Sequence, residues 1–592
     1  MECVQSNHQS LHTVLTRKAK VLRRSKKTSK VKVLRVLIAI IIGLCSFFFF
    51  GQRVAYADRV EPAEILVDTE PEVEVETESE FVTESVIDSE EITMTKMDIN
   101  ESDEIHQNII RFEEAGLAFI LETEAIIQDT NSHYELISEK SIVNIMLDDL
   151  RGSDHLAYNT SVYSGRYMES STYTKSYDYE ELDFEGMPAH IYTFERMPLV
   201  YGPELMSNFA YIEIELDERI LLSVHVKSNE AIDVEQYLNR FVRIETDVDT
   251  KSELAIMELK VSELDVEIMT GDQFENDPVS FEHEKTTEAY NEIFESSEDS
   301  DEVTWGIFDP STHYELTYVE EIENNTGISL DIILEYYDLD YLPRVEKMRE
   351  ISESGRILEL TYQTSKYGVF NADALYEVLD GKHDNMIDEL IIRIKELDEP
   401  VLFRPNNEMN GDWCGYNAMY THKETEVYKT FWRWLYERFE EADCDNVIWV
   451  WNPNWGDFPN AEWNHYLQYF PGEEYVDVVG LTGYNTGTYY EAEQWKSFAE
   501  IYMPMLWEYK KHFTDYPYMI TEFGSSAIGG DKGQWIESVF KQIEKLDIKA
   551  AVWWNHVDYD TKKGVVSRGY KFNNDPNIMN IFRENFKDKQ MK

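Results

Sequence analysis

From residue 305 onward, short apolar runs alternate with longer segments whose apolar residues recur every three or four positions. The runs are typical of buried strands, and the longer spacing is typical of amphipathic helices. The helix-like stretches include residues 385–397, 424–441 and 534–546. The predicted strands are residues 305–308, 330–337, 356–362, 401–404, 446–451, 476–481, 518–521 and 550–554. This repeated order predicts an α/β fold, a (β/α)8 TIM barrel over residues 304–592.

Residues 105–283 have a different pattern. Residues 209–217 and 220–226 alternate apolar with polar residues, which is typical of strands with one buried face, whereas 109–127 and 234–241 look helical. We expect a small α+β or β-rich accessory domain here. A cluster of tyrosines in it is either a sugar-stacking surface or ordinary packing at the edge of the domain. These tyrosines are Tyr158, Tyr163, Tyr167, Tyr173, Tyr177 and Tyr179.

The first 57 residues are typical of an export segment. A block of Lys and Arg precedes the apolar run 36–51, and this order directs the remainder of a chain across a membrane. Ala55-Tyr56-Ala57 matches the small-residue pattern of a signal-peptidase site. The sequence leaves open whether the apolar run is removed or kept as a membrane anchor. In either case we expect the later domains to lie outside the cell, secreted or anchored.

Charge is distributed unevenly along the chain, which has a formal net charge of −61. Residues 58–104 and 284–303 are rich in acids and poor in apolar residues, so we expect acidic linkers there, the first of them disordered. Nucleic acid requires a basic surface, and the only basic block is at the N-terminus. We therefore exclude nucleic acid as a partner and expect a polysaccharide instead.

Cysteine is scarce, with four residues in the whole chain. Cys3 and Cys45 lie in the export segment, which leaves Cys414 and Cys444 as either a disulfide or two free thiols. Their spacing does not match a metal-ligand pattern, and we expect neither a metal nor a cofactor. The sequence gives no indication of the oligomeric state.

Polar and aromatic residues follow several predicted barrel strands, at the end where TIM barrels gather their reactive groups. Glu408 follows the fourth strand and Glu522 ends the seventh, so the two carboxyls should face each other across the barrel mouth. Retaining hydrolysis of a glycoside needs two carboxyls about 5 to 5.5 Å apart, one as acid and one as nucleophile. Nearby, Arg404 offers charge, Tyr484 a hydrogen bond and Trp553 exclusion of water.

Four motifs resemble those of glycoside hydrolase family 26, a family of β-mannanases and related endoglycanases. They are FRPNNEMNGDW at 403–413, VGLTGYN at 479–485, ITEFG at 520–524 and WWN at 553–555. The resemblance covers about residues 305–586. It implies that Glu408 is the acid/base, that Glu522 is the nucleophile and that Tyr484 positions it. The substrate-binding residues that we predict are Arg404, Asn407, Trp413, Tyr484, Trp553, Trp455 and Trp554.

The chain departs from the mannanase pattern beside the acid/base. Many family members carry His immediately before that glutamate, whereas this chain carries Asn407, and residues 360–363 lack a histidine that mannanases often place near the −1 subsite. We expect a retaining endo-β-glycanase, with β-1,4-mannan as its substrate. The alternatives are a β-1,3-1,4-glucan, a xylan or a cell-envelope polysaccharide. An alternative of another class is a non-catalytic surface protein that binds polysaccharide.

Overall fold

The computed structural model describes a large part of the chain between residues 109 and 586. The described residues are 109–112, 116–120, 126–130, 133–138, 140–149, 169, 171–217, 220–243, 258–260, 268–270, 274, 276, 281–295, 303–365, 373–560 and 562–586. The expected export segment and the linker at 58–104 lie outside them. None of the helices formed by the described residues has the length and apolar character that a membrane crossing requires.

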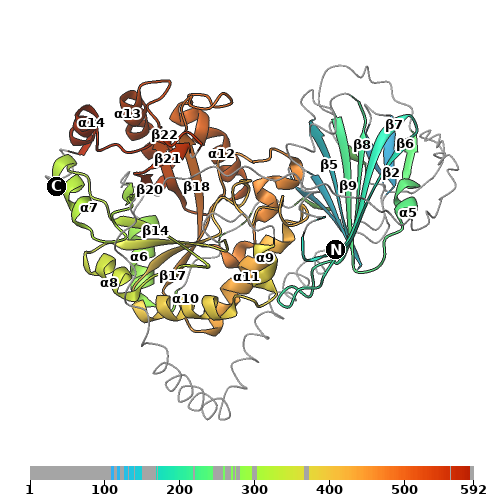
Figure 1. Cartoon of the computed structure of the whole chain (residues 1–592), viewed down its shortest axis with the longest axis horizontal. Coiled ribbons are helices and arrows are strands. Elements are labelled where there is room, and N and C mark those ends of the chain that lie inside the picture. Colours follow the sequence, from blue (N-terminus) through green and yellow to red (C-terminus); the bar gives the residue numbers. More distant parts are fainter. Residues whose placement is uncertain are drawn as a thin grey trace, which may run out of the picture. The chain divides into compact units, whose positions relative to one another are not determined.

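The C-terminal half is a closed barrel of eight parallel strands that follow one another in chain order (Figure 1). The strands are β13 (Thr304–Phe308), β14 (Ile332–Asp338), β15 (Ile357–Gln363), β16 (Val401–Pro405), β17 (Val447–Trp451), β18 (Val478–Asn485), β19 (Tyr518–Ser525) and β20 (Ile548–Trp554). The prediction of a (β/α)8 barrel is confirmed, because each expected strand overlaps one of these.

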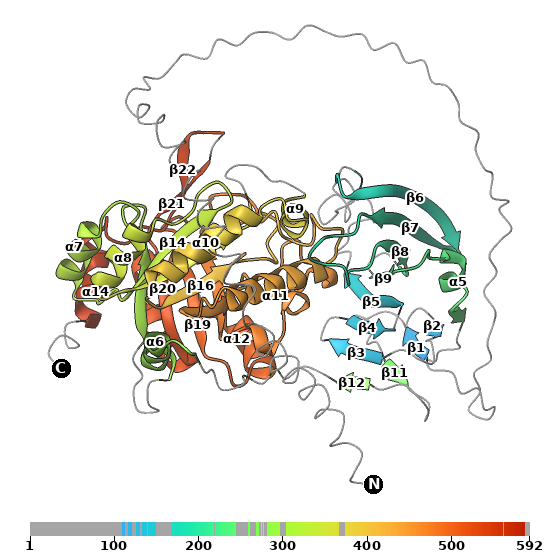
Figure 2. The ribbon, with the colours of Figure 1, turned by 90° about the horizontal axis from the view of Figure 1, so that it is seen from below.

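Helices cover the outside of the barrel (Figure 2). They are α7 (Thr317–Thr326), α8 (Val345–Glu353), α9 (Ala374–Leu379), α10 (Asp384–Leu397), α11 (Glu426–Glu441), α12 (Phe498–His512), α13 (Lys532–Gln542) and α14 (Pro576–Phe586). Short 3-10 turns occur at Glu462–Asn464, Tyr466–Tyr469, Glu473–Tyr475 and Ile543–Leu546. Strands β21 (Val557–Asp560) and β22 (Val565–Gly569) form a hairpin after β20.

Apolar side chains fill the barrel because alternate residues of each strand point inward. Leu334, Leu402 and Val450 belong to this interior cluster. Helix α6 (Glu284–Phe294) joins it through one buried face that includes Tyr290. The sequence reading had placed these residues in an acidic linker. That expectation is wrong for 284–294, because three apolar residues at helical spacing find a partner in the barrel.

The accessory domain is built from two sheets with an apolar core. One sheet has the strand order β10-β2-β1-β11, and the other has the order β12-β3-β4-β5-β9-β8-β7-β6. The elements are β1 (Ile109–Phe112), β2 (Leu117–Ile120), β3 (Ile126–Thr130), β4 (His133–Ile137), β5 (Ser141–Asp149), β6 (Thr174–Phe184), β7 (Met187–Arg196), β8 (Asn208–Glu215), β9 (Ile220–Ser228), α5 (Val234–Leu238), β10 (Phe241–Arg243), β11 (Glu258–Lys260) and β12 (Ile268–Thr270).

Of the two helices expected in this domain, one is present and the other is not. The helix expected at 234–241 is present as α5, although it ends at Leu238 and a strand begins at Phe241. The helix expected at 109–127 is wrong, because this segment contains β1, β2 and the start of β3. Short apolar runs fit both periods, and the positive φ of 64° at Gly116 marks the turn that separates two of these strands.

The tyrosine cluster does not form one described surface. Tyr158, Tyr163 and Tyr167 lie outside the described residues. Tyr173 is buried, and its ring lies 5.1 Å from that of Tyr376 in the barrel domain. Among the tyrosines of this group that are described, only Tyr179 is largely exposed. Of the two interpretations, sugar stacking and packing, the structure therefore supports packing for Tyr173.

A glycine in the first barrel strand tests how tightly the interior is packed. A Cβ atom on Gly306 would lie 2.7 Å from Cβ of Ile332 and 2.9 Å from Cγ2 of Val552. We expect Gly306→Ala to lower the free energy of unfolding by about 1–3 kcal/mol, because overpacking forces the strands apart. Urea denaturation measures the change. Gly569→Ala is the matched control, since a Cβ there meets no atom within 4 Å. Equal midpoints for the two variants would contradict the prediction.

Candidate active site

Strand β16 ends in a segment with unusual backbone geometry. Asn406 and Glu408 have positive φ angles of 48° and 54°, a conformation that costs free energy for residues other than glycine. Hydrogen bonds offset this cost: the Glu408 N–H donates to the Asn452 carbonyl at 2.7 Å, and the Thr364 N–H donates to Oδ1 of Asn406 at 2.8 Å. The segment is thereby held in a conformation that presents Asn407 and Glu408 at the end of the barrel.

Glu522 lies on β19 and is 3% exposed. The Arg404 guanidinium is 2.7 Å from its Oε1, and the Tyr484 hydroxyl donates to its Oε2 at 2.6 Å. The Asn407 side-chain amide also donates to Oε1, at 3.2 Å. Three donors thus hold this buried carboxyl in one position.

The surroundings of Glu408 differ from those of Glu522. Burial raises the pKa of Glu408, and the negative charge of Glu522 raises it further. The Trp413 indole N–H donates to Oε2 of Glu408 at 3.3 Å, and this contact opposes the rise. A carboxyl that keeps its proton at neutral pH is suited to protonate a leaving group.

Arg404 is fully buried and holds the inner end of the site together. Its Nε lies 3.2 Å from Glu359 and donates to the Thr361 hydroxyl at 2.8 Å, while Nη1 donates to the Asn452 amide oxygen at 2.8 Å. Burial lowers the pKa of Arg404, but the charges of Glu522 and Glu359 outweigh burial and raise it. The guanidinium therefore stays charged beside Glu522.

Glu359, on β15, is a third carboxyl that sequence reasoning missed. It has no exposed surface, and burial raises its pKa to about 8, although the Arg404 charge opposes the rise. At neutral pH the protonated form of Glu359 is favoured, and Arg404 lies between this carboxyl and that of Glu522. The only signal in the sequence was an acidic residue within an apolar strand, where charged residues seldom occur.

Gln363 was also missed, although it ends the same strand. Its side-chain amide donates to Oδ1 of Asn407 at 2.9 Å, and the Tyr416 hydroxyl lies 3.3 Å from the same oxygen. With that oxygen occupied, the amide nitrogen of Asn407 is the end that faces Glu522. Gln363 stands in the segment where the family resemblance led us to look for a histidine, and it pairs with Asn407, the other departure from that pattern.

Aromatic rings lie on the acid/base side of the site. Trp413 is 41% exposed, and its ring is 5.5 Å from that of Phe458. Trp455 lies 6.2 Å from Phe458, and the Lys496 ammonium lies 4.6 Å from the Trp455 ring. Trp413 is thus open to solvent beside Glu408, as a sugar-stacking residue must be. Phe458 is a neighbouring ring that no sequence motif indicated.

The prediction that Trp553 stacks on a sugar is corrected by its packing. Trp553 is 3% exposed, and its ring lies 4.6 Å from Phe523 and 5.9 Å from Phe582 of α14. Strand residues alternate between faces, so the neighbouring Trp554 points the other way. Trp554 is partly exposed, and its ring lies edge-on to Tyr484 at 5.9 Å. The ring that reaches the site is therefore that of Trp554.

Cys414 and Cys444 are buried free thiols. The sequence left open whether these cysteines form a disulfide or two free thiols, and in the structure they are free thiols. Within the described ranges, no cluster of three or more His, Cys, Asp or Glu side chains has an arrangement that would hold a metal ion.

Comparison with known proteins places this geometry in context. Residues 359–563 match the family model described as glycosyl hydrolase family 26. Endoglucanase H of Acetivibrio thermocellus is 27% identical over 273 residues, which are 45% of this chain and 28% of that protein. A mannan endo-1,4-beta-mannosidase of Bacillus subtilis strain 168 is 32% identical over 120 residues, which are 19% of this chain and 32% of that protein. The chain spans about a third or less of the length of these relatives.

Among solved structures, a GH26 beta-mannanase from Bacteroides ovatus aligns with a TM-score of 0.39 and 20% identity. The alignment covers 51% of this chain and 92% of that one. The residues matched by the family model include both Glu408 and Glu522. Over residues 359–563, the C-terminal barrel of this chain is therefore similar to glycoside hydrolase family 26.

Proposed function

We propose that the barrel is a retaining endo-β-glycanase. The observation that carries this proposal is the opposite treatment of its two glutamates: burial and a neighbouring charge raise the pKa of Glu408, whereas three donors surround Glu522. A carboxyl with a raised pKa, beside a second carboxyl held in place by hydrogen-bond donors, is the arrangement that an acid and nucleophile pair requires. The assignment of these residues to catalysis stays a prediction until it is tested.

In this mechanism Glu408 gives its proton to the glycosidic oxygen while a Glu522 oxygen attacks the anomeric carbon. The glycosidic bond breaks, the leaving chain departs as an alcohol, and the sugar is held as an ester of Glu522. Glu408, now ionised, takes a proton from water, and the resulting hydroxide equivalent displaces Glu522 with retention. Arg404 and Tyr484 stabilise the carboxylate that is released in this second step.

We propose β-1,4-mannan as the substrate, which the mannosidase relatives support. A mixed-linkage β-glucan is the second candidate, because the endoglucanase relative aligns over 273 residues and the mannosidase of B. subtilis over 120. The Gln363–Asn407 pair favours this second candidate as well. By resemblance to related barrel enzymes, Asn407 would contact the sugar 2-hydroxyl, which is axial in mannose and equatorial in glucose.

We further propose that the enzyme acts outside the cell, secreted or anchored. The basic block, the apolar run 36–51 and the Ala-rich cleavage pattern in the sequence support this location. A non-catalytic role in binding polysaccharide would leave the charge arrangement around Glu408 and Glu522 without a purpose.

Removal of either glutamate tests the catalytic assignment. We expect Glu522→Ala to abolish hydrolysis of every substrate, because no nucleophile is left. Glu408→Ala should lower the rate on polysaccharide by about 10²–10⁴-fold while an aryl glycoside with a good leaving group still reacts. Reducing-sugar and chromogenic assays measure the two effects. Glu353→Ala, which removes an exposed carboxyl from α8, is the control. Wild-type turnover in both active-site variants would refute the assignment.

A panel of polysaccharides tests the substrate. We expect the chain to release reducing ends most rapidly from β-1,4-mannan. The panel also includes barley β-glucan, β-1,4-xylan, β-1,3-xylan and isolated cell-envelope polymer, compared by kcat/KM. Release from mixed-linkage glucan alone would replace mannan by the second candidate. A slow fall in viscosity relative to reducing-end release would contradict endo action.

The raised pKa of Glu408 predicts the alkaline side of the pH profile. Glu408 is protonated below its pKa, so activity should be lost as pH rises through that value. Trp413→Phe removes the N–H donor that favours ionised Glu408. The pKa should then increase, and the alkaline limb of kcat/KM should move to higher pH. Phe458→Leu alters the neighbouring ring without removing a donor and should leave the limb in place. A shift to lower pH in Trp413→Phe would contradict this account.

A further inference from the structure

The segment that carries Glu408 is a long connection whose far end meets the accessory domain. We call residues 406–425, which join β16 to α11, the acid/base loop. Glu408 lies at its beginning, and His422, Lys423 and Glu424 lie near its end. Strands β6 to β9 of the accessory domain contact this end through hydrogen bonds, ring contacts and ion pairs.

His422 is enclosed by side chains from the accessory domain. The Tyr211 hydroxyl donates to the His422 carbonyl at 2.6 Å, and Nε2 of His422 lies 2.7 Å from the Thr174 hydroxyl. The Phe194 ring stacks on the imidazole at 5.1 Å. These contacts come from β6, β7 and β8. Side chains on the large sheet of the accessory domain therefore hold His422 in place.

Three ion pairs continue the contact along the chain. Lys423 lies 2.8 Å from Glu213, and Arg196 lies 3.2 Å from Glu424. All four of these side chains are at most 1% exposed. A buried ion pair contributes little net stability, because desolvation consumes the Coulombic gain, but it penalises every other alignment of the two partners.

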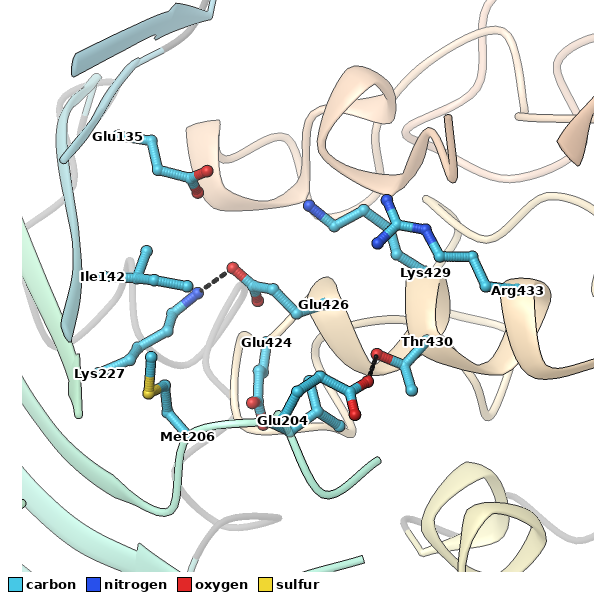
Figure 3. A pocket seen from close by; sticks show the side chains of 11 residues that line it. Glu135, Ile142, Glu204, Met206, Lys227, Glu424, Glu426, Lys429, Thr430 and Arg433 are labelled. Atoms are coloured by element: carbon cyan, nitrogen blue, oxygen red, sulfur yellow. Dashed lines mark hydrogen bonds and ion pairs between the residues drawn. The ribbon is translucent and has the colours of Figure 1, made fainter. Parts of the chain in front are cut away.

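The third pair, between Lys227 of β9 and Glu426 at the start of α11, has a distance of 2.7 Å (Figure 3). It borders a cavity of about 180 Å³ that both domains line. In Figure 3, Thr430 of α11 contacts Glu204 in the same region, at 3.4 Å. The charges on the accessory domain thus alternate to match those of the loop, acid against Lys423 and bases against Glu424 and Glu426.

The backbone at the point of contact is strained. His422 and Lys423 have positive φ angles of 59° and 56°, which non-glycine residues adopt at a cost of about 1 kcal/mol or more each. Two such residues in succession persist only where the surroundings impose them. The accessory domain supplies those surroundings through Tyr211 and Glu213.

Hydrogen bonds within the loop connect this contact to the acid/base. The Lys423 N–H donates to the Ala418 carbonyl at 2.8 Å. The Asn417 amide donates to the Met409 carbonyl at 2.8 Å, and the Tyr416 hydroxyl donates to the Asn407 carbonyl at 2.7 Å. The last two acceptors are the residues on either side of Glu408.

We propose that the accessory domain positions the catalytic acid/base, with Arg196, Tyr211 and Glu213 acting on Glu408 through the acid/base loop. The inference rests on the proposed retaining mechanism, because it assigns the loop the task of aiming a proton donor. Arg196, Tyr211 and Glu213 are positioning residues, since none of them lies in the site. The domain is therefore a structural part of the active site in addition to any other role.

Leaving-group dependence separates positioning from simple stability. A polysaccharide leaving group is a poor one and needs the proton of Glu408, whereas dinitrophenolate leaves without it. The value of kcat/KM reports the step that forms the ester of Glu522. Misplacement of Glu408 should therefore lower kcat/KM on polysaccharide and spare it on the dinitrophenyl β-glycoside. A general loss of folded protein lowers both values equally.

The test uses the full chain with two variants and a matched control. Tyr211→Phe removes only the hydroxyl that holds the His422 carbonyl. The double change Arg196→Met with Glu424→Gln removes one ion pair without leaving a buried charge. The control is Ser171→Ala, which removes a contact of 2.5 Å to Asp373 elsewhere between the two domains. Circular dichroism and thermal unfolding are recorded for each.

We expect the double variant to lose about tenfold or more in kcat/KM on polysaccharide, and to change less than about twofold on the dinitrophenyl glycoside. Tyr211→Phe should show the same selectivity with a smaller loss, and the control should show none. Azide should accelerate turnover of the double variant, because it replaces water activated by Glu408. Equal losses on both substrates, or wild-type values in both variants, overturn the inference. A wild-type chain that hydrolyses neither substrate overturns the proposed function and, with it, this inference.

Discussion

The buried guanidinium of Arg404 is the contact on which the chemistry of this barrel depends. It has no exposed surface, and it joins Glu522 to Glu359 and Thr361 of β15 and to Asn452, which follows β17. A buried charge is tolerated only when it is paired, and two carboxyls lie within ion-pair distance of Arg404. The position of Glu522 is therefore fixed by the same interactions that make burial of Arg404 possible. The contacts that pack the inner end of the barrel are therefore the same contacts that hold the charges of the site in place.

The sequence was sufficient to predict the barrel and its two glutamates, because both depend on patterns within single segments. Eight apolar runs in alternation with amphipathic helices specify the fold, and strand ends locate the reactive end. The error at Trp553 shows the limit of this reasoning. Two adjacent tryptophans satisfy the same motif, but only the alternation of the strand decides that Trp554 faces the inside. Glu359 and Gln363 were missed because their roles come from partners 45 and 44 residues away in the chain.

The accessory domain was harder to interpret for a related reason. Arg196 and Glu424 are 228 positions apart, and each reads as an ordinary surface residue in its own segment. The alternation of residues 209–217 and 220–226 predicted strands with one buried face. In the structure the other face is buried as well, because Tyr211 and Glu213 of β8, with Phe194 of β7, contact His422 and Lys423 of the barrel. No local pattern distinguishes a face that meets solvent from one that meets another domain.

Glu408 and Glu522 are held by different means, and this difference explains why Glu408 needs support from outside the barrel. Glu522 lies within β19, where strand pairing fixes its backbone and Arg404 and Tyr484 fix its carboxyl. Glu408 lies beyond the end of β16, in a left-handed conformation at the start of a loop that runs to residue 425. Strand pairing cannot hold such a residue. A long loop pays conformational entropy for every fixed residue, and contacts at its far end offset that loss only if they are rigid themselves. Buried ion pairs to a second domain satisfy this requirement, because they allow a single alignment.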